Sequence, residues 1–304
     1  MRLVTRSDFD GLACAMMLKE LNMIDEIKFV HPKDVQDGII ELSSNDITTN
    51  LPYDPRVSLA FDHHESETDR LKETDTSKLI IDENARSAAR VVYDYYGGKE
   101  KFTRISEELM AAVDKGDSAD FTMDEILNPT GWVLLHYLMD ARTGLGRFHD
   151  FRISNYDLMM ELIDYCMEHT IDEILELPDI KERTTLYFEQ AELFKEQLKR
   201  ITKVYGKVAV IDLRNEEVIY AGNRFMVYAL FPETEISAHV AWGFKKQNTA
   251  VMIGKSIVNK NSKVDIGELC LSYGGGGHAN AGTCQLDNDK VDEELPVIIE
   301  KLNG

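Results

Sequence analysis

The sequence predicts an α/β protein with a mostly parallel N-terminal sheet flanked by helices, a helical linker and a smaller α+β C-terminal domain. Short apolar runs alternate with helix-like segments through the first half, which is typical of parallel sheets covered by helices. A long charged segment with few helix breakers follows at 182–205. Because 304 residues is long for one domain, we expect two domains, at 1–181 and 206–304, joined by that segment.

The strands expected in the first domain are short apolar runs bounded by turn residues. They lie at 3–5, 26–30, 46–50, 57–61 and 79–81. The expected helices lie at 12–21, 88–96 and 106–113. Ser87 is the N-cap expected for the second of these helices, and Gly97-Gly98 ends it. Polar residues that follow such strands are delivered to the carboxyl edge of the sheet, where ligands bind in folds of this class.

The rest of the chain changes pattern twice. Residues 132–170 are helix-like and rich in Met, Leu and Tyr, and we interpret them as core or as a homodimer contact rather than as a cofactor site. A long helix is expected at 182–204. The second domain should then follow the order strand, helix, two strands, helix, strand and helix. These elements are expected at 207–212, 223–231, 236–244, 249–253, 266–272, 283–286 and up to 302.

Composition restricts the class of partner. The chain has 34 basic and 54 acidic residues, a formal charge of −20, so its surface repels long polyanions such as duplex DNA while small anions remain acceptable. Its four cysteines form no C-x-x-C pair and suit a reduced cytoplasm. No apolar run approaches the ~20 residues that span a bilayer, and the N-terminus reads as folded chain rather than as a signal peptide. We therefore expect a cytoplasmic protein.

The triplet Asp62-His63-His64 directly follows the strand predicted at 57–61. Carboxylate oxygens together with neutral imidazole nitrogens suit manganese, zinc or iron better than calcium. Taken alone, the triplet would be explained better by a solvated strand end than by a metal site.

A second acidic motif, Asp8-x-Asp10-Gly11, follows the first predicted strand. Two carboxylates spaced by one residue in a turn can face one cation, and Gly11 allows the backbone to bend as the helix begins. Acidic residues are also favoured in the first turn of any helix by its dipole, which explains either Asp alone better than the pair.

The third motif is a run of four glycines, Gly274 to Gly277, followed by His278. Glycines leave backbone amides uncovered, so a phosphate can approach them closely, and His278 adds a donor. Flexible linkers share this composition, but a helix-like and a strand-like segment flank the run here.

The order and spacing of the three motifs resemble the DHH phosphoesterase superfamily with its DHH-associated C-terminal domain, over almost the whole chain. Members with this build include nano-RNases, phosphatases of 3′-phosphoadenosine 5′-phosphate, single-strand exonucleases and exopolyphosphatase-related proteins. The stretch Asn50-Leu51-Pro52-Tyr53 is most similar to the last group.

The resemblance implies roles for particular residues. Asp62, His63 and His64 would form the catalytic motif, with Asp62 orienting its neighbours and His64 facing substrate or the leaving group. The metal ligands would come from Asp8, Asp10, Asn50, His63 and Asp114, with Asp117 as the alternative to Asp114. The substrate-binding residues would be Arg224, Lys255, Ser256, Gly275, Gly276, Gly277 and His278.

Two positions depart from the superfamily pattern. Val4 occupies a place where relatives carry a metal-binding His, and Asn50 occupies the place of an Asp that bridges two metals. An amide oxygen brings no charge to such a bridge. We therefore expect one metal site made by Asp10, His63 and Asp114, with help from Asp8 or Asn50, and a second site that is weak or absent.

The sequence thus predicts a metal-dependent phosphoesterase acting on a small phosphorylated substrate, such as a short single-stranded oligonucleotide or a nucleotide phosphate. We expect one or two divalent ions, with Mn²⁺ as first choice and Mg²⁺ or another ion as the alternative. The alternative function is a non-catalytic or regulatory nucleotide-binding protein with a degraded metal site.

Overall fold

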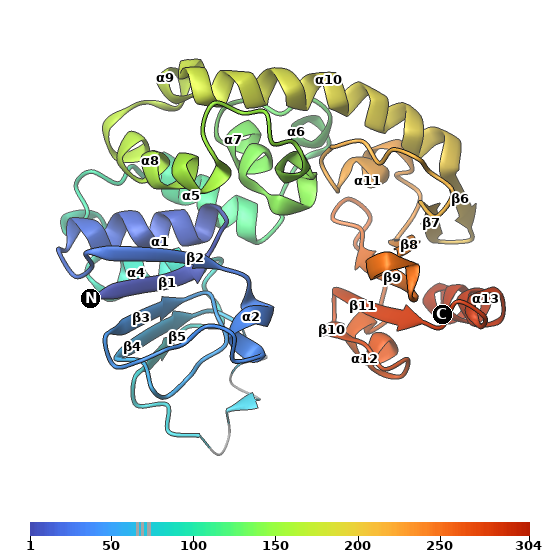
Figure 1. Cartoon of the computed structure of the whole chain (residues 1–304), viewed down its shortest axis with the longest axis horizontal. Helices are drawn as coiled ribbons and strands as arrows, with labels where there is room; N and C mark the ends of the chain where they lie inside the picture. Colours follow the sequence, from blue (N-terminus) through green and yellow to red (C-terminus); the bar gives the residue numbers. More distant parts are fainter. Residues whose placement is uncertain (65–66, 68–69, 72–73) are drawn as a thin grey trace. The chain divides into compact units, whose positions relative to one another are not determined.

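The computed structural model describes residues 1–304 apart from 65–66, 68–69 and 72–73. The chain divides into two compact units (Figure 1). The first consists of Met1–Phe121 and Pro129–Thr185, and the second of Thr122–Asn128 and Leu186–Gly304. In the described part of the chain, none of the helices combines the length and the apolar character needed to cross a membrane.

The first unit is built on a five-stranded sheet in the order β2-β1-β3-β4-β5. The strands are β1 (Arg2–Arg6), β2 (Glu26–Val30), β3 (Asp46–Thr49), β4 (Leu59–Asp62) and β5 (Leu79–Ile81). Every pairing is parallel, so all the strands end at one edge. The expected parallel sheet flanked by helices is confirmed, with strand bounds shifted by one or two residues.

Helices surround this sheet. They are α1 (Phe9–Glu20), α2 (Pro32–Gln36), α4 (Ala88–Tyr95), α5 (Glu107–Asp117), α7 (Gly131–Met139), α8 (Asn155–Glu168) and α9 (Ile171–Glu176). The helix α1 contacts β1 and also packs against α4, α5 and α8 (Figure 1). The helical pattern expected over 132–170 is divided between α7 and α8. Two short 3₁₀ turns and a loop separate α7 from α8, and Gly144 in this stretch has the left-handed φ of 87° that breaks a helix.

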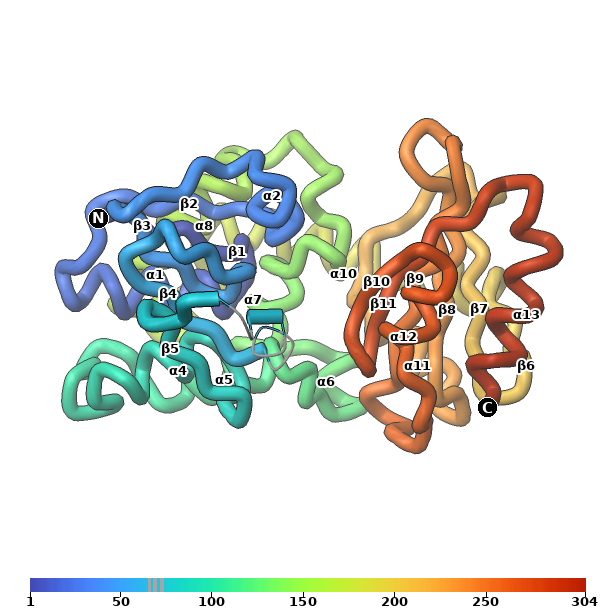
Figure 2. Tube along the Cα trace, turned by 90° about the horizontal axis from the view of Figure 1, so that it is seen from below, coloured from blue at the N-terminus to red at the C-terminus, as the bar shows by residue number. Residues whose placement is uncertain are grey.

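The helix expected at 182–204 is α10 (Pro178–Ile201), and it ends earlier than predicted because β6 (Thr202–Tyr205) follows it directly. This strand starts the sheet of the second unit, ordered β10-β11-β9-β8-β7-β6. The other strands are β7 (Val208–Asp212), β8 (Ile236–Trp242), β9 (Thr249–Lys255), β10 (Gly276–His278) and β11 (Ala281–Leu286). Figure 2 shows this succession, in which only β7 and β8 pair in parallel.

The second unit also contains α6 (Met123–Leu127), α11 (Met226–Leu230), α12 (Ile266–Leu271) and α13 (Val291–Asn303). The inward-facing residues of β7, β8 and β9 form one apolar core with residues of α12 and α13. The glycine run, expected as a phosphate-binding loop, instead enters β10 at Gly276 and pairs with β11. Small residues favour this close pairing, because a Cβ at Gly277 would lie only 2.3 Å from the carbonyl oxygen of Ala281.

Gly11 has a different role from the turn predicted for it. It lies inside α1 rather than in the loop, and a Cβ there would lie 2.0 Å from the carbonyl oxygen of Arg6. We expect Gly11→Ala to reduce the free energy of unfolding by about 1–3 kcal/mol, since the helix would have to move away from β1. Urea unfolding measures this. Gly146→Ala is the matched control because a Cβ there has only an ordinary 3.6 Å contact, and equal stability losses in the two variants would contradict the prediction.

Candidate metal and catalytic site

The candidate site lies at the carboxyl edge of the first sheet. Asp8 is the N-cap of α1 and accepts a hydrogen bond from the backbone N–H of Gly11, while Asp10 lies in the first turn. Asp62 is the last residue of β4, and the two histidines follow it. Neighbouring parallel strands thus bring together motifs that are fifty residues apart in sequence.

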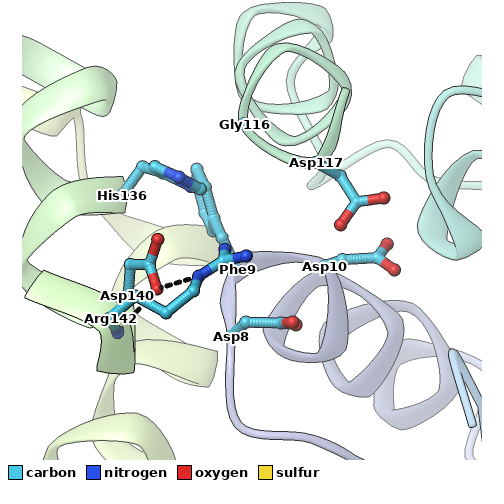
Figure 3. A pocket seen from close by; sticks show the side chains of 8 residues that line it. All are labelled: Asp8, Phe9, Asp10, Gly116, Asp117, His136, Asp140 and Arg142. Atoms are coloured by element: carbon cyan, nitrogen blue, oxygen red, sulfur yellow. Dashed lines mark hydrogen bonds and ion pairs between the residues drawn. The ribbon is translucent and has the colours of Figure 1, made fainter. Parts of the chain in front are cut away.

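Asp10, His63 and Asp117 form the cluster that we call the three-ligand site. Each offers one ligand atom, and these atoms lie within 4.8 Å of one another. Figure 3 shows Asp10 and Asp117 directed into a common space, with Asp8 beside them. Asp10 is buried and accepts hydrogen bonds from the backbone N–H groups of Ala88 and Ala89, at the N-terminus of α4. The dipole of that helix favours the ionised carboxylate.

The histidine of this cluster is held in the tautomer that a metal requires. His63 Nδ1 lies 3.2 Å from the carbonyl oxygen of Ala85 and donates a hydrogen bond to it. The proton of the neutral ring is therefore on Nδ1, and Nε2 is left as the ligand atom. Nε2 is buried and lies 3.0 Å from Oδ2 of Asp117, yet the two are not aligned for a hydrogen bond. Within the described residues Nε2 has no hydrogen-bond partner. A buried nitrogen beside two carboxylates fits a divalent ion of the manganese, zinc or iron type.

Electrostatics also favour a cation at the three-ligand site. Burial raises the pKa of Asp10 well above its usual value, and the carboxylates of Asp117 and Asp8 raise it further. Burial lowers the pKa of His63, but Asp117 and Asp10 outweigh this effect and raise it to about 9. Burial raises the pKa of Asp117, but His63 overrides it and the pKa falls below its usual value. Without an ion, the His63 imidazolium therefore partly neutralises the site.

Metal binding is consequently expected to depend on pH. The paired imidazolium stabilises the metal-free fold fully below pH 6.5, and this stabilisation is lost as pH rises through about 9. Because an ion needs neutral His63, manganese affinity should rise by up to about tenfold per pH unit over the same range. Calorimetry in buffers of different ionisation enthalpy measures both affinity and proton release. In His63→Gln the pH dependence of the affinity should weaken, because only the carboxylates still titrate, and a flat wild-type affinity would contradict this account.

The structure favours Asp117 over Asp114 as the metal ligand, the reverse of the expectation from sequence. Asp114 does not belong to the three-ligand site, because it accepts hydrogen bonds from Ser87 and from Nε and Nη2 of Arg90. It holds α4 against α5. Asp117, one helical turn later, is the residue that reaches His63. The expected ligand set containing Asp114 is therefore corrected to one containing Asp117.

The ligand atoms of Asp62, His63 and His64 also lie within 4.8 Å of one another, whereas three further residues add little to a second ion site. Val4 is fully buried in an apolar cluster and offers no ligand. Asn50 Nδ2 donates a 2.6 Å hydrogen bond to Oδ2 of Asp10. Asn50 therefore orients Asp10, at the position where the superfamily pattern has a carboxylate that bridges two ions. Asp8 lies 3.0 Å from Nε of Arg6, outside the three-ligand site.

Asp62 organises the turn after β4. Its buried Oδ1 accepts hydrogen bonds from the backbone N–H groups of His63 and His64 and from Nδ1 of His64 at 2.7 Å. The His64 side chain is 42% exposed, so its Nε2 edge can reach a substrate. The pair resembles the arrangement in which a carboxylate fixes the tautomer of a histidine that transfers protons.

The predicted substrate residues all lie in the second unit. The Gly275 amide already donates to the carbonyl oxygen of Cys270, and Gly276, Gly277 and His278 form β10. Ser256 is buried, and its Oγ accepts from two backbone amides of the following turn. The Gly275 amide is therefore already paired, while the Ser256 hydroxyl keeps its own O–H as a donor. Lys255 ends β9, and the cation Arg224 precedes α11.

A pocket beside the three-ligand site contains residues that the sequence reading missed. It is lined by Asp8, Phe9, Asp10, Gly116, Asp117, His136, Asp140 and Arg142 (Figure 3). Gly116 allows α5 to approach α7, because a Cβ there would lie 2.5 Å from Nδ1 of His136. The sequence shows the Asp140-x-Arg142 pair, but nothing local in the sequence indicates that the pair lies beside Asp8 and Asp10 in the folded chain.

A solved structure of high similarity decides the family. The pGpG-specific phosphodiesterase of Vibrio cholerae is 55% identical, with a TM-score of 0.85, and the match covers 99% of this chain and 98% of that one. The chain belongs to the DHH phosphoesterase superfamily. This DHH phosphoesterase is a metal-dependent hydrolase of phosphoester bonds in small phosphorylated substrates. The alternative of a non-catalytic binding protein is set aside.

Two more distant structures share the fold. An exopolyphosphatase-related protein of Bacteroides fragilis is 13% identical, with a TM-score of 0.53, and the match covers 99% of this DHH phosphoesterase and 92% of that chain. CDC45 of Entamoeba histolytica is 6% identical, with a TM-score of 0.52 and coverage of 100% and 95%. No protein-family model and no curated protein sequence matches the chain.

Proposed function

We propose that this enzyme hydrolyses linear, 5′-phosphorylated dinucleotides such as pGpG to mononucleotides. The observation that supports this most strongly is the 55% identity to a pGpG-specific phosphodiesterase along nearly the full length of both chains. The formal charge of −20 also favours a short substrate, because a longer polyanion would meet more of the repelling surface.

The ion is proposed to be a single Mn²⁺ held by the three-ligand site. When bound, it supplies the positive charge that polarises a phosphoryl group and acidifies water. Asp10 and Asp117 provide two negative charges and His63 a neutral nitrogen, a donor set that matches one divalent ion in charge and chemistry. Asn50 keeps Asp10 oriented through its 2.6 Å hydrogen bond.

His64 is proposed to deliver a proton to the leaving oxygen of the scissile bond. Asp62 accepts from Nδ1 of His64, so the proton is transferred at Nε2 on the exposed edge of the ring. The proposed anion-binding residues of the second unit are Lys255, Arg224 and His278. We propose that residues 1–181 carry the metal chemistry and that residues 206–304 bind the substrate.

The test is hydrolysis by the purified full chain of pGpG, a cyclic dinucleotide, 3′-phosphoadenosine 5′-phosphate and polyphosphate, each with Mn²⁺, Mg²⁺ or Zn²⁺. We expect pGpG with Mn²⁺ to give the highest kcat/KM by at least about tenfold. His63→Gln is the inactive control. Turnover of another class with none of pGpG would reject the proposed substrate while leaving the phosphoesterase assignment intact.

A further inference from the structure

The inference concerns Arg142, in the loop after α7, and it rests on the proposed function. The Arg142 side chain extends from this loop towards the carboxylates of the metal centre (Figure 3). It is 50% exposed, so a ligand can reach its tip. Burial lowers the pKa of Arg142, but the carboxylates of Asp140, Asp8 and Asp117 outweigh this and raise it, which places the guanidinium in the field of the metal site.

The same local turn occurs three times in the described part of the chain, which allows a comparison. In each copy an Asp Oδ1 accepts hydrogen bonds from the backbone N–H and Nε of the Arg two residues later. The copies are Asp54-x-Arg56, Asp140-x-Arg142 and Asp212-x-Arg214. Arg56 and Arg214 also donate from Nη2 to the second carboxylate oxygen, at 2.6 and 2.7 Å. At Arg142, within the described residues, only Nε makes a side-chain hydrogen bond.

The Asp140 carboxylate thus fixes the Arg142 guanidinium through Nε and leaves both terminal nitrogens for another acceptor. A guanidinium held this way presents a planar pair of donors, the geometry that matches two phosphate oxygens. Arg56 and Arg214 donate paired hydrogen bonds to the aspartates of their own turns. The turn itself therefore permits paired bonding, and the single side-chain hydrogen bond of Arg142 is a feature of its place next to Asp8.

Charge balance shows what such a donor would add. Arg6 offsets Asp8 at 3.0 Å, and a divalent ion would offset Asp10 and Asp117. An arriving phosphodiester brings one further negative charge into a site already surrounded by carboxylates. One positively charged donor on the Asp8 side would offset that charge, because Val4 offers no ligand to a second ion and Asn50 offers at most an uncharged amide oxygen.

We propose that Arg142 is a substrate-binding residue whose terminal guanidinium nitrogens donate hydrogen bonds to non-bridging oxygens of the phosphate at the three-ligand site. Arg142 supplies the positive charge that a second ion would otherwise provide there. Asp140 positions it.

The experiment measures pGpG binding by calorimetry in EDTA, where no turnover occurs, and separately Mn²⁺ stoichiometry and affinity. Arg142→Gln is expected to weaken pGpG binding about 10- to 100-fold, the effect of losing charge-assisted hydrogen bonds. Arg142→Lys should recover part of the loss, because it keeps the charge but not the paired donors. Both variants should keep Mn²⁺ stoichiometry. Arg56→Gln, which breaks the same turn elsewhere in this unit, is the matched control and should bind pGpG as the wild type does.

Wild-type pGpG affinity in Arg142→Gln overturns the inference, and so does loss of Mn²⁺ from that variant, which would mean that Arg142 only maintains the site. If Arg142→Gln does not fold, Arg142→Lys decides in the same way. If the wild type hydrolyses pGpG and Arg142→Gln binds pGpG with unchanged affinity, the role of Arg142 is rejected while the proposed function stands. A wild type that neither binds pGpG in EDTA nor hydrolyses it with Mn²⁺ rejects both.

Discussion

Asp117→Asn is expected to lose bound Mn²⁺ and with it hydrolysis, whereas Asp114→Asn is expected to keep the ion and lose stability. Asp117 is one of the three proposed ligands, so its loss should lower metal affinity by more than the roughly 100-fold typical of residues that merely support a ligand. Asp114 instead accepts two hydrogen bonds from Arg90 and one from Ser87. Replacing its charge should lower the free energy of unfolding by about 1.5–3 kcal/mol.

The two variants are matched, since they make the same chemical change one turn apart on α5. Metal content after gel filtration and urea unfolding of the metal-free proteins separate the two effects. The opposite pattern, with the ion lost from Asp114→Asn and retained by Asp117→Asn, would restore the ligand set expected from sequence and contradict the geometry of the three-ligand site.

His64→Asn is expected to lower kcat for pGpG by about 10²- to 10⁴-fold, the usual contribution of a general acid. The Asn side chain can still donate to Asp62, so the turn should remain folded and Mn²⁺ affinity should be unchanged. The loss should shrink strongly on a p-nitrophenyl ester of GMP, because nitrophenolate leaves without a proton.

A control for this prediction is His169→Asn, which alters an exposed histidine paired with Glu173 and should leave kcat as in the wild type. An equal loss on pGpG and on the nitrophenyl ester would show that His64 acts in binding or attack rather than in protonating the leaving group.

Much of the fold was predictable because its signals are local. The strands β2, β4 and β5 are short runs of mostly apolar residues, and Ser87 caps α4 as expected. The strand β6 escaped prediction because it directly follows the charged helix α10, and β10 escaped because a glycine run becomes a strand only by pairing with β11. Pairing partners of that kind are set by tertiary structure, not by periodicity.

The site was predictable in its motifs but not in its final geometry. His63 directly follows β4, and Asp10 lies in the first turn of the helix that follows β1, so the ends of these parallel strands bring the two residues together. The choice between Asp114 and Asp117 depends on Arg90, which pairs with the first and leaves the second facing His63. Such a choice is decided by packing between α4 and α5, which a single sequence does not display.

The pairing of Arg6 with Asp8 also affects how the enzyme would respond to metal supply. If one ion per active site suffices, occupancy follows a simple saturation curve in free Mn²⁺, without the steep threshold that two interdependent ions produce. Activity would then decline in proportion as the metal becomes scarce, and breakdown of the dinucleotide would continue at a reduced rate under manganese limitation instead of stopping abruptly.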